Sequence, residues 1–509
     1  MERTSNKRIA RNTIFLYFRM IFNILLQLYT VPVVLRVLGT EDYGLYNVIG
    51  GITILFSFLG GSMVSGVNRF LAFAIGENDQ AKLNKVYNTT YSIYVIITII
   101  AVVVFEIGGN WFILNKMIIP DGRLMAVLII FHFTIITFIF DILNIPAESS
   151  LVAHECLDVY AYLSVVTSLL KLVVVILIQF ISFDHLITYT FLLLLVSVGQ
   201  KLFLRYYCAK KFEECRGYKW SFDKKLSKEL LVYSGYNMIG YLASVLRQQG
   251  LNLLMNVFFG TLLNAAHGIA NSIRAVLDSF VGNIYMAARP QITKYYASGD
   301  LDGMWTLVYR TSLLSFYLVL VISIPASIEL DTVLTLWLYD VPQYTVKIAR
   351  AFFICLLIET TTLQLIYVFQ AANKIKAIQI YGSSLLLLNI PIAYIVLKIC
   401  SDNPMLPYYV QIVFSILYVL TTIIISVWIS KLDYKYFIVN ILMRELFVAT
   451  FVAASLFYIS SFFTPSIIRV VITCASSLII TSLLVASIGF NKKDRTLILS
   501  VIQSKLFVR

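Results

Sequence analysis

The 509-residue sequence contains few charged residues. Lysine, arginine, aspartate and glutamate make up 13% of it, against about 25% in a typical soluble domain. It also has only 4 histidines and 6 cysteines, and no two cysteines form a CxxC pair. The first shortage argues against a soluble globular protein, and the second argues against a disulfide framework or a metal cluster. We therefore expect no metal site and no cofactor.

Motifs for catalysis and nucleotide binding are also missing. The chain has no G-x-S-x-G, H-E-x-x-H or G-x-G-x-x-G motif. Its nearest approach to a phosphate-binding loop, residues 39–44, continues with Leu45 and Tyr46 instead of Lys-Ser/Thr. We expect neither an enzyme nor an ATPase, so any transport must use an ion gradient, the substrate's own gradient or a partner.

Apolar residues, by contrast, are abundant at 59% of the chain. A bilayer-spanning helix needs about 20 of them, so the sequence can supply on the order of fourteen spans. The predicted class is an all-α polytopic membrane protein with little chain left for a soluble domain. The expected helices run over residues 13–38, 45–75, 87–107, 124–144, 159–181, 186–208, 230–258, 262–288, 305–328, 346–372, 378–398, 408–430, 441–462 and 467–490.

The net charge of +13 lies mostly in alternate loops, which determines membrane orientation and does not indicate a nucleic-acid partner. The positive-inside bias places these loops, and both termini, in the cytoplasm. One intervening loop, residues 145–158, is expected on the same side although it carries acidic residues and no basic one. The basic segments are 3–11, 82–85, 205–228, 289–294, 374–376, 431–435 and 492–509.

The two halves of the chain resemble each other. Residues 39–90 align with residues 260–312, and Gly39 then matches Gly260 while Gly76 matches Gly299. An even number of helices per repeat predicts a parallel duplication about an axis along the membrane normal. The expected organisation is an N-terminal six-helix lobe (1–208), a basic connector (209–229), a C-terminal six-helix lobe (230–430), and two extra helices with a basic tail (431–509).

Ionisable residues deep inside a span cost roughly 2.5–3.5 kcal/mol each, so they usually face a bundle interior or a wet cavity. We identify Lys171, Arg247, Arg274, Asp278 and Glu359 as such residues, whereas the last two helices have no deep charge and are expected to be peripheral. The three cations outnumber the two anions. A positive cavity suits anionic solutes, and guanidinium groups match phosphate oxygens.

Helical spacing places further polar residues beside these charges. Asn271 lies on one face of its helix with Arg274 and Asp278, and Gln248 follows Arg247 on the helix before. Two alternatives remain open: Arg274 and Asp278 can simply neutralise each other, and Arg19, about 9 Å into its span, can extend to the membrane surface. The candidate substrate-binding residues are Arg19, Lys171, Arg247, Gln248, Asn271 and Arg274, and the candidate ion-coupling residues are Asp278 and Glu359.

Two segments resemble a known family. Residues 38–46, Leu-Gly-Thr-Glu-Asp-Tyr-Gly-Leu-Tyr, and residues 252–300, with Phe-Phe-Gly at 258–260 and Pro-Gln-Ile-Thr-Lys at 290–294, resemble the polysaccharide flippases of the MOP exporter superfamily. The resemblance implies two lobes around a cavity that opens alternately to each side of the bacterial inner membrane. It implies an undecaprenyl-pyrophosphate-linked oligosaccharide (O-antigen, capsule or exopolysaccharide unit) as substrate, with Arg19 and Arg274 on the pyrophosphate.

The same resemblance implies membrane lipid as surroundings, coupling to H⁺ or Na⁺ through intramembrane carboxylates, and a polysaccharide polymerase as a possible partner. One alternative is a multidrug or toxin cation antiporter of the same superfamily, for which we would expect a net acidic cavity. A less favoured alternative is a membrane glycan polymerase, which usually has a large external loop. The outer loops expected here are short, the longest being residues 108–123 and 329–345.

Overall fold

The computed structural model describes residues 2–55, 64, 67–68, 70–71, 73–77, 79–154, 156–338, 340–372, 374–400, 402–430 and 432–489, and its described part is helical throughout. The first half contains α1 (Glu2–Ile54), α3 (Gln80–Val104), η1 (Phe105–Gly109), α4 (Asn110–Asn115), α5 (Leu124–Ala153), α6 (Leu157–Leu177), η2 (Ile178–Phe180), α7 (His185–Lys211), η3 (Glu213–Cys215) and α8 (Lys224–Phe259). The second half contains α9 (Thr261–Ala297), α10 (Leu301–Trp337), α11 (Thr345–Thr360), α12 (Leu363–Ala371), α13 (Ile375–Ala377), η4 (Ile378–Gly382), α14 (Ser383–Ile399), α15 (Leu406–Ser430), α16 (Tyr434–Phe437), η5 (Ile438–Leu442), α17 (Met443–Ser461), α18 (Ile467–Leu484) and η6 (Val485–Gly489).

The membrane-spanning class is confirmed. Within the described ranges, 11 helical segments are long and apolar enough to cross a membrane. The polar helices α8 and α9, which carry most of the predicted site residues, are not among them. The total of fourteen spans therefore stays a prediction, and the later part of the second expected helix, residues 56–75, lies largely outside the described residues.

The expected loop at residues 145–158 is wrong for most of its length. Helix α5 continues through Pro146 to Ala153. The polar residues that suggested a loop are internal: Ser149 and Ser150 are buried, and Glu148 accepts a hydrogen bond from Lys201 of α7 at 2.7 Å. Polar side chains that pair with a neighbouring helix are compatible with a buried helix, although in the sequence they look like loop residues.

Gly39 and Gly260, which the repeat alignment pairs, adopt the same rare backbone conformation. Gly39 has φ 76° and ψ 168° and interrupts α1, and Gly260 has φ 81° and ψ −168° between α8 and α9. This region of φ/ψ space is open essentially to glycine alone. The two corners also meet, because a Cβ on Gly44 would overlap the backbone oxygen of Thr261. The agreement supports the internal duplication, whereas of the pair Gly76 and Gly299 only Gly299 has a positive φ.

The chain forms two compact units. Unit 1 contains residues 1–269 and 390–404, and unit 2 contains residues 270–389 and 405–509, so the chain crosses between them inside α9, inside α14 and again between α14 and α15. The lobe boundaries expected from the sequence stay predictions.

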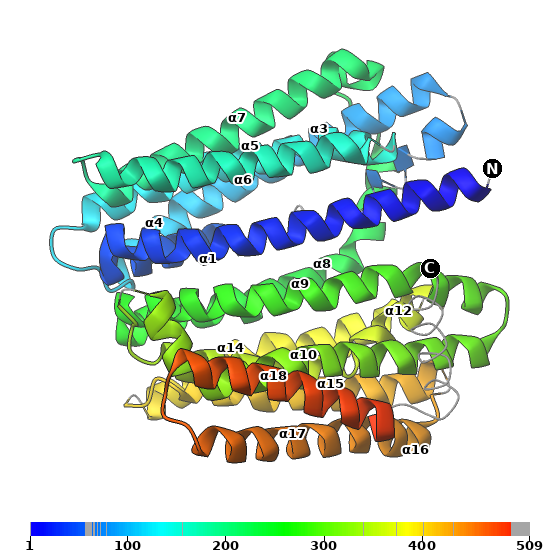
Figure 1. Cartoon of the computed structure of the whole chain (residues 1–509). Helices are drawn as coiled ribbons and strands as arrows, with labels where there is room; N and C mark the ends of the chain where they lie inside the picture. The colour runs from blue at the N-terminus through cyan, green and yellow to red at the C-terminus, as the bar shows by residue number, and fades with distance from the viewer. Residues whose placement is uncertain are drawn as a thin grey trace. The chain divides into compact units, whose positions relative to one another are not determined.

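In unit 1, helix α1 packs against α5, α6 and α8, and α5 packs along α7 (Figure 1). Arg123, which precedes α5, joins three of these elements: its guanidinium forms ion pairs with Asp42 of α1 and with Asp184, the N-cap of α7. Burial alone would raise the pKa of Asp184, but hydrogen bonds from Arg123 and from the backbone N–H of Ile187 lower it below its usual value. The Asp184 carboxylate therefore stays ionised at neutral pH and keeps its ion pair with Arg123.

A buried amide network holds α8 to α9 in the same unit. Asn256 donates to the Asn264 side chain at 3.0 Å, and Asn264 donates to the side-chain oxygen of Asn252 at 2.9 Å. Asn252 in turn donates to the backbone oxygen of Asn47 on α1 at 3.0 Å. Each amide has partners in its neighbours, so the network avoids the cost of an unsatisfied buried polar group.

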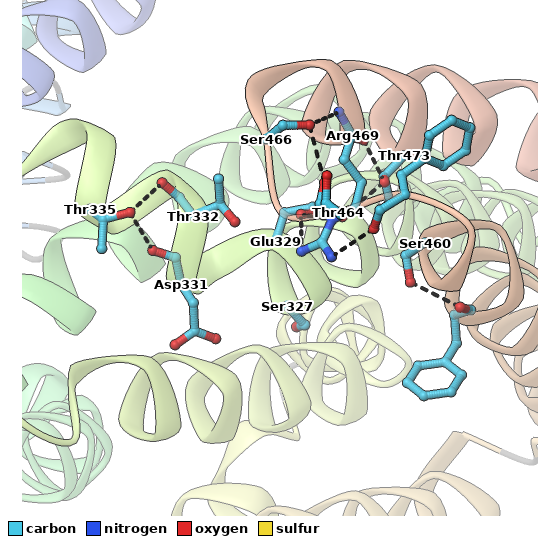
Figure 2. Close-up of polar contacts among 12 residues, drawn as sticks. Ser327, Glu329, Asp331, Thr332, Thr335, Ser460, Thr464, Ser466, Arg469 and Thr473 are labelled. Carbon is cyan, nitrogen blue, oxygen red and sulfur yellow. Dashed lines mark hydrogen bonds and ion pairs between the residues drawn. The ribbon is translucent and has the colours of Figure 1, made fainter.

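In unit 2, helix α10 packs against α11, α17 and α18 (Figure 1). Figure 2 shows the polar contact between α10 and α18: Arg469 donates to Glu329 at 2.9 Å, and Thr473 donates to the other oxygen of the same carboxylate at 3.0 Å. Glu329 is only 1% exposed. Ser466 caps the N-terminus of α18 directly before this contact.

The expectation that the last two helices carry no deep charge is wrong for the first of them. Glu445 lies inside the span Tyr434–Ser461 and is 2% exposed, whereas Arg469 lies in the first turn of α18, at the edge of its span. In the sequence, Glu329 and Arg469 lie at the ends of apolar runs and look like surface residues. Their mutual pairing is what makes burial possible.

Gly39→Ala should destabilise the protein by about 1–3 kcal/mol, because alanine rarely adopts this conformation. The matched control is Gly50→Ala, in a helical part of the same element. Neither glycine has an atom within 4 Å of an added Cβ, so only the backbone conformation differs. Thermal unfolding of the purified protein measures both, and equal melting temperatures for the two variants would contradict the conformational explanation.

Arg469→Met should destabilise the protein by about 3–5 kcal/mol, since it leaves the Glu329 carboxylate buried without a cation. The double variant Glu329→Leu/Arg469→Met should recover most of that loss, because no uncompensated charge remains. Thermal unfolding of the two variants and of the wild type gives the comparison. A double variant less stable than the single one would show that the pair contributes more than mutual neutralisation.

Candidate functional site

The clearest cluster of predicted site residues lies in unit 2, around Arg274 of α9. Its guanidinium donates to Glu359 of α11 at 3.2 Å and to Asp278, one turn along α9, at 3.4 Å. It also lies 5.5 Å from the ring centre of Phe352. Glu359 accepts a second hydrogen bond, from Ser415 of α15 at 2.7 Å. Three helices thus contribute to one buried charge cluster.

This geometry changes how Glu359 is interpreted. No residue of its own helix pairs with it, yet a neighbouring helix supplies the partner. Arg274 faces two carboxylates, so these three residues together carry one net negative charge. Of the two possibilities left open for Arg274, the described contacts favour neutralisation. A phosphate could reach the guanidinium only in competition with Glu359 and Asp278.

A second carboxyl group lies near a break in the same span. Helix α11 ends at Thr360 and α12 begins at Leu363. At this break Thr361 donates to Glu445 of α17 at 2.7 Å. The other Glu445 oxygen has no hydrogen-bond partner, and no described residue forms an ion pair with this side chain. An ionised carboxylate buried without a cation is strongly unfavourable, so Glu445 is suited to carry a proton or a bound cation.

Sequence reasoning missed Glu445 because it stands beside Arg444 near the start of an apolar run, where an acidic residue usually faces water. The triple threonine at 360–362 was the available signal. Three consecutive β-branched hydroxyl residues weaken a helix, and a discontinuous membrane helix is a recurrent place for ion sites in transporters.

Unit 1 contains a cavity of about 560 Å³ between parts of α1, α5, α6 and α7. Lys201 of α7 reaches Glu148 at 2.7 Å and Asp141 at 3.2 Å, both on α5. Lys171 of α6 lines the same cavity, and no described residue forms an ion pair or hydrogen bond with its ammonium group. Hydroxyl groups complete much of the lining: Tyr46, Thr53, Thr134, Thr137, Thr190 and Ser197.

The remaining predicted site residues are distributed between the units. Arg247 and Gln248 lie on α8 in unit 1, half-buried and exposed respectively, and Asn271 lies half-buried on α9 in unit 2. The side chain of Arg19 lies outside the described residues, although its backbone belongs to α1. The structure therefore brings together Arg274, Asp278 and Glu359, and separately places Lys171 in a cavity.

Charged groups on the described helices are not limited to the five identified from the sequence. Others that pair with, or are buried against, a neighbouring element include Asp141, Glu148, Lys201, Glu329, Glu445 and Arg469. Local pairing, not the overall count, decides which groups remain available to a ligand.

Comparison with known proteins shows which solved structures share this fold. No protein-family profile matches the chain. The "Uncharacterized membrane protein EpsK" of Bacillus subtilis (strain 168) is 22% identical over 363 residues, covering 70% of each chain. An inward-facing MATE multidrug resistance transporter of the MOP superfamily has a TM-score of 0.67 at 14% identity, over 80% of this chain and 96% of that one. The lipid II flippase MurJ in an inward closed conformation has a TM-score of 0.68 at 13% identity, over 93% of this chain and 98% of that one.

The chain therefore has the all-α, multi-pass membrane fold of MOP-superfamily transporters. These two solved structures are a multidrug resistance transporter and a lipid II flippase. At these identities the likeness establishes the fold and leaves the substrate to be argued from the residues.

Arg274→Ala should destabilise the protein by about 3–5 kcal/mol, because it removes the cation that neutralises buried Glu359. The double variant Arg274→Ala/Glu359→Gln should be close to wild type in thermal stability, since glutamine can still accept the Ser415 hydrogen bond without a charge. A single variant that melts like the wild type would return Arg274 to the role of a substrate contact.

Proposed function

We propose that this protein is a flippase that moves an undecaprenyl-pyrophosphate-linked oligosaccharide across the bacterial inner membrane, as a multi-pass protein with both termini in the cytoplasm. The head group would load from the cytoplasmic side, the two lobes would rock about it, and the polyprenyl tail would stay in lipid. The proposal rests on the fold, on the positive-inside pattern and on the cavity of unit 1.

The observation that carries the proposal is Lys171 in that cavity. About 560 Å³ lies within the range of roughly 300–1,000 Å³ typical of small-molecule sites. Its hydroxyl groups can exchange hydrogen bonds with sugar hydroxyls, and the Lys171 ammonium, without an ion-pair partner among the described residues, can contact an anionic group. The same lining also contains the carboxylates Asp141 and Glu148, both of which pair with Lys201.

The other candidate substrate contacts remain part of the proposal: the resemblance implies Arg19 as a pyrophosphate contact, and the polar helix faces of the sequence suggest Arg247, Gln248 and Asn271. Lobe boundaries at residues 208 and 430 belong to the same proposal. The lipid II flippase among the solved structures supports a lipid-linked substrate on this fold. We also keep a polysaccharide polymerase as the expected partner.

Ion coupling would use the carboxyl groups of unit 2. A proton or Na⁺ that neutralises Glu359 would weaken its ion pair with Arg274, and the freed guanidinium could then donate hydrogen bonds to a pyrophosphate oxygen. By linkage, an anion on Arg274 would in turn favour cation uptake by Glu359. Asp278 competes for the same guanidinium, and Glu445 is a further candidate for carrying the coupled ion.

A multidrug or toxin cation antiporter is the second candidate. It is favoured by the excess of carboxylates over cations at Arg274 and by Glu445, which has no cationic partner among the described residues. Drug susceptibility after deletion, with normal surface glycan, would favour it over the flippase.

Lys171→Gln should lower the rate of glycan-lipid flipping at least tenfold, because a single ammonium contact with a phosphate is worth about 1.5–3 kcal/mol. Lys171→Arg should keep much of the flipping rate, because it keeps the positive charge. The control is Lys116→Gln, which removes an exposed lysine at the C-terminal end of α4. Purified protein in vesicles is assayed with a defined undecaprenyl-pyrophosphate-linked sugar, with and without H⁺ or Na⁺ gradients. Wild-type flipping by Lys171→Gln would remove the cavity from the proposal.

A further inference from the structure

A second, larger hollow lies on unit 1, away from the cavity of Lys171. It measures about 840 Å³ and lies between the N-terminal turns of α3 and α8, with Phe70 and Phe73 of the preceding helical segment on one side. We call it the lysine pocket. The residues that line it are Phe70, Phe73, Lys82, Lys85, Val86, Asp223, Lys225, Leu226, Lys228 and Glu229.

Ion pairs already fix the frame of the lysine pocket. Lys85 of α3 pairs with Asp223 at 2.5 Å, and Lys82 pairs with Glu77 at 2.5 Å. Asp223 also caps α8 by accepting the backbone N–H of Leu226 at 2.7 Å. That hydrogen bond, together with Lys85, lowers the pKa of the Asp223 carboxyl. The carboxylate thus stays ionised and joins the two helix ends at neutral pH.

Two further lysines of the pocket have no such partner. Lys225 and Lys228 are exposed on the first turns of α8, and no described residue forms an ion pair or hydrogen bond with either. Among the described residues that line the pocket, the carboxylates are Asp223, which pairs with Lys85, and Glu229. The pocket therefore presents an uncompensated positive charge.

The lining of the pocket also contains apolar side chains. Phe73 is 63% exposed, and the Lys82 ammonium lies 5.2 Å from its ring centre. Phe70, Val86 and Leu226 extend this surface. A free inorganic anion would use the lysines and leave the aromatic rings unused, whereas an amphiphile with an anionic head would use both.

The position of the pocket matches a membrane surface. Segments 82–85 and 205–228 are two of the basic segments that the positive-inside bias assigns to the cytoplasm, and the Lys85 to Asp223 ion pair shows that α3 and the connector do meet. Basic residues near the surface of a membrane each contribute about 1 kcal/mol to the attraction of anionic lipid.

We propose that the lysine pocket binds the phosphate-bearing head group of a lipid in the cytoplasmic leaflet, with Lys225 and Lys228 on the phosphate and Phe70 and Phe73 against the adjoining hydrocarbon. The lipid is either a bulk anionic phospholipid or the polyprenyl pyrophosphate of the transported glycan. Only the second source rests on the proposed function, in which case the pocket is the place where substrate first docks.

The test uses native mass spectrometry of the full-length protein purified in detergent, with four probes added in turn: phosphatidylglycerol, undecaprenyl pyrophosphate, diacylglycerol and inorganic pyrophosphate. The wild type should retain the first two and not diacylglycerol, which lacks phosphate. Inorganic pyrophosphate should displace neither at an equal concentration. Retention of diacylglycerol, or displacement by inorganic pyrophosphate, would overturn the assignment.

Lys225→Gln/Lys228→Gln should weaken binding of the retained lipid about tenfold or more, from the loss of two surface cations. Lys225→Arg/Lys228→Arg should bind like the wild type. The matched control is Lys210→Gln/Lys435→Gln, which removes the same charge at two exposed lysines that do not line the pocket. An equal loss in the control pair would reduce the effect to general surface charge and contradict a pocket.

The relative affinities of the two lipids identify which of them the lysine pocket binds. Tighter retention of undecaprenyl pyrophosphate than of phosphatidylglycerol assigns the pocket to substrate docking, and equal retention assigns it to bulk anionic lipid. If phosphatidylglycerol binds at the lysines while vesicles containing the protein flip no glycan lipid, the proposed function fails and the pocket stands. Unchanged melting temperatures in the variants separate lost binding from lost folding.

Discussion

The cost of an unpaired charge inside the bilayer governs the arrangement of this chain. Arg274 with Glu359 and Arg469 with Glu329 each join helices far apart in sequence. Removing either partner leaves a buried charge uncompensated, so each pair selects one helix neighbour over others of equal hydrophobicity. In a medium where apolar faces gain little from meeting one another, such pairs specify which helices pack together. The last helix, α18, is fixed to α10 in this way.

The sequence was sufficient to predict what depends on local chemistry. Apolar length predicts membrane helices, and glycine at 39 and 260 predicts corners where only that residue fits, because both effects act within a few residues of chain. The same sequence could not predict partners across helices. Periodicity places Arg274 and Asp278 on one face of α9 but does not say which helix lies opposite. Glu359 therefore looked unpartnered until α9 and α11 were seen side by side.

Misreadings of the sequence share one cause. Glu148 lies in an expected loop (145–158) and Glu329 begins another (329–345), whereas Glu445 lies inside the expected helix 441–462 but was not counted among its deep charges. Each is neutralised or hydrogen-bonded by a side chain from another helix: Lys201, Arg469 and Thr361 respectively. Once charges are paired this way, a total count of cations and anions says little about the ligand. The charged groups available to a ligand are those without an ion-pair partner.

By that criterion the two units differ in what they offer a ligand. Among the described residues, unit 1 has a cation without an ion-pair partner in its cavity, Lys171, and two more in the lysine pocket, Lys225 and Lys228. Unit 2 has a carboxyl group without a cationic partner, Glu445, at a helix break. In the proposed transport cycle the first kind of group would bind the substrate's anion and the second would bind the driving ion. Groups of both kinds in contact would neutralise each other, as Arg274 and Glu359 do, so the proposed coupling needs them on different helices, with linkage through changes in helix packing.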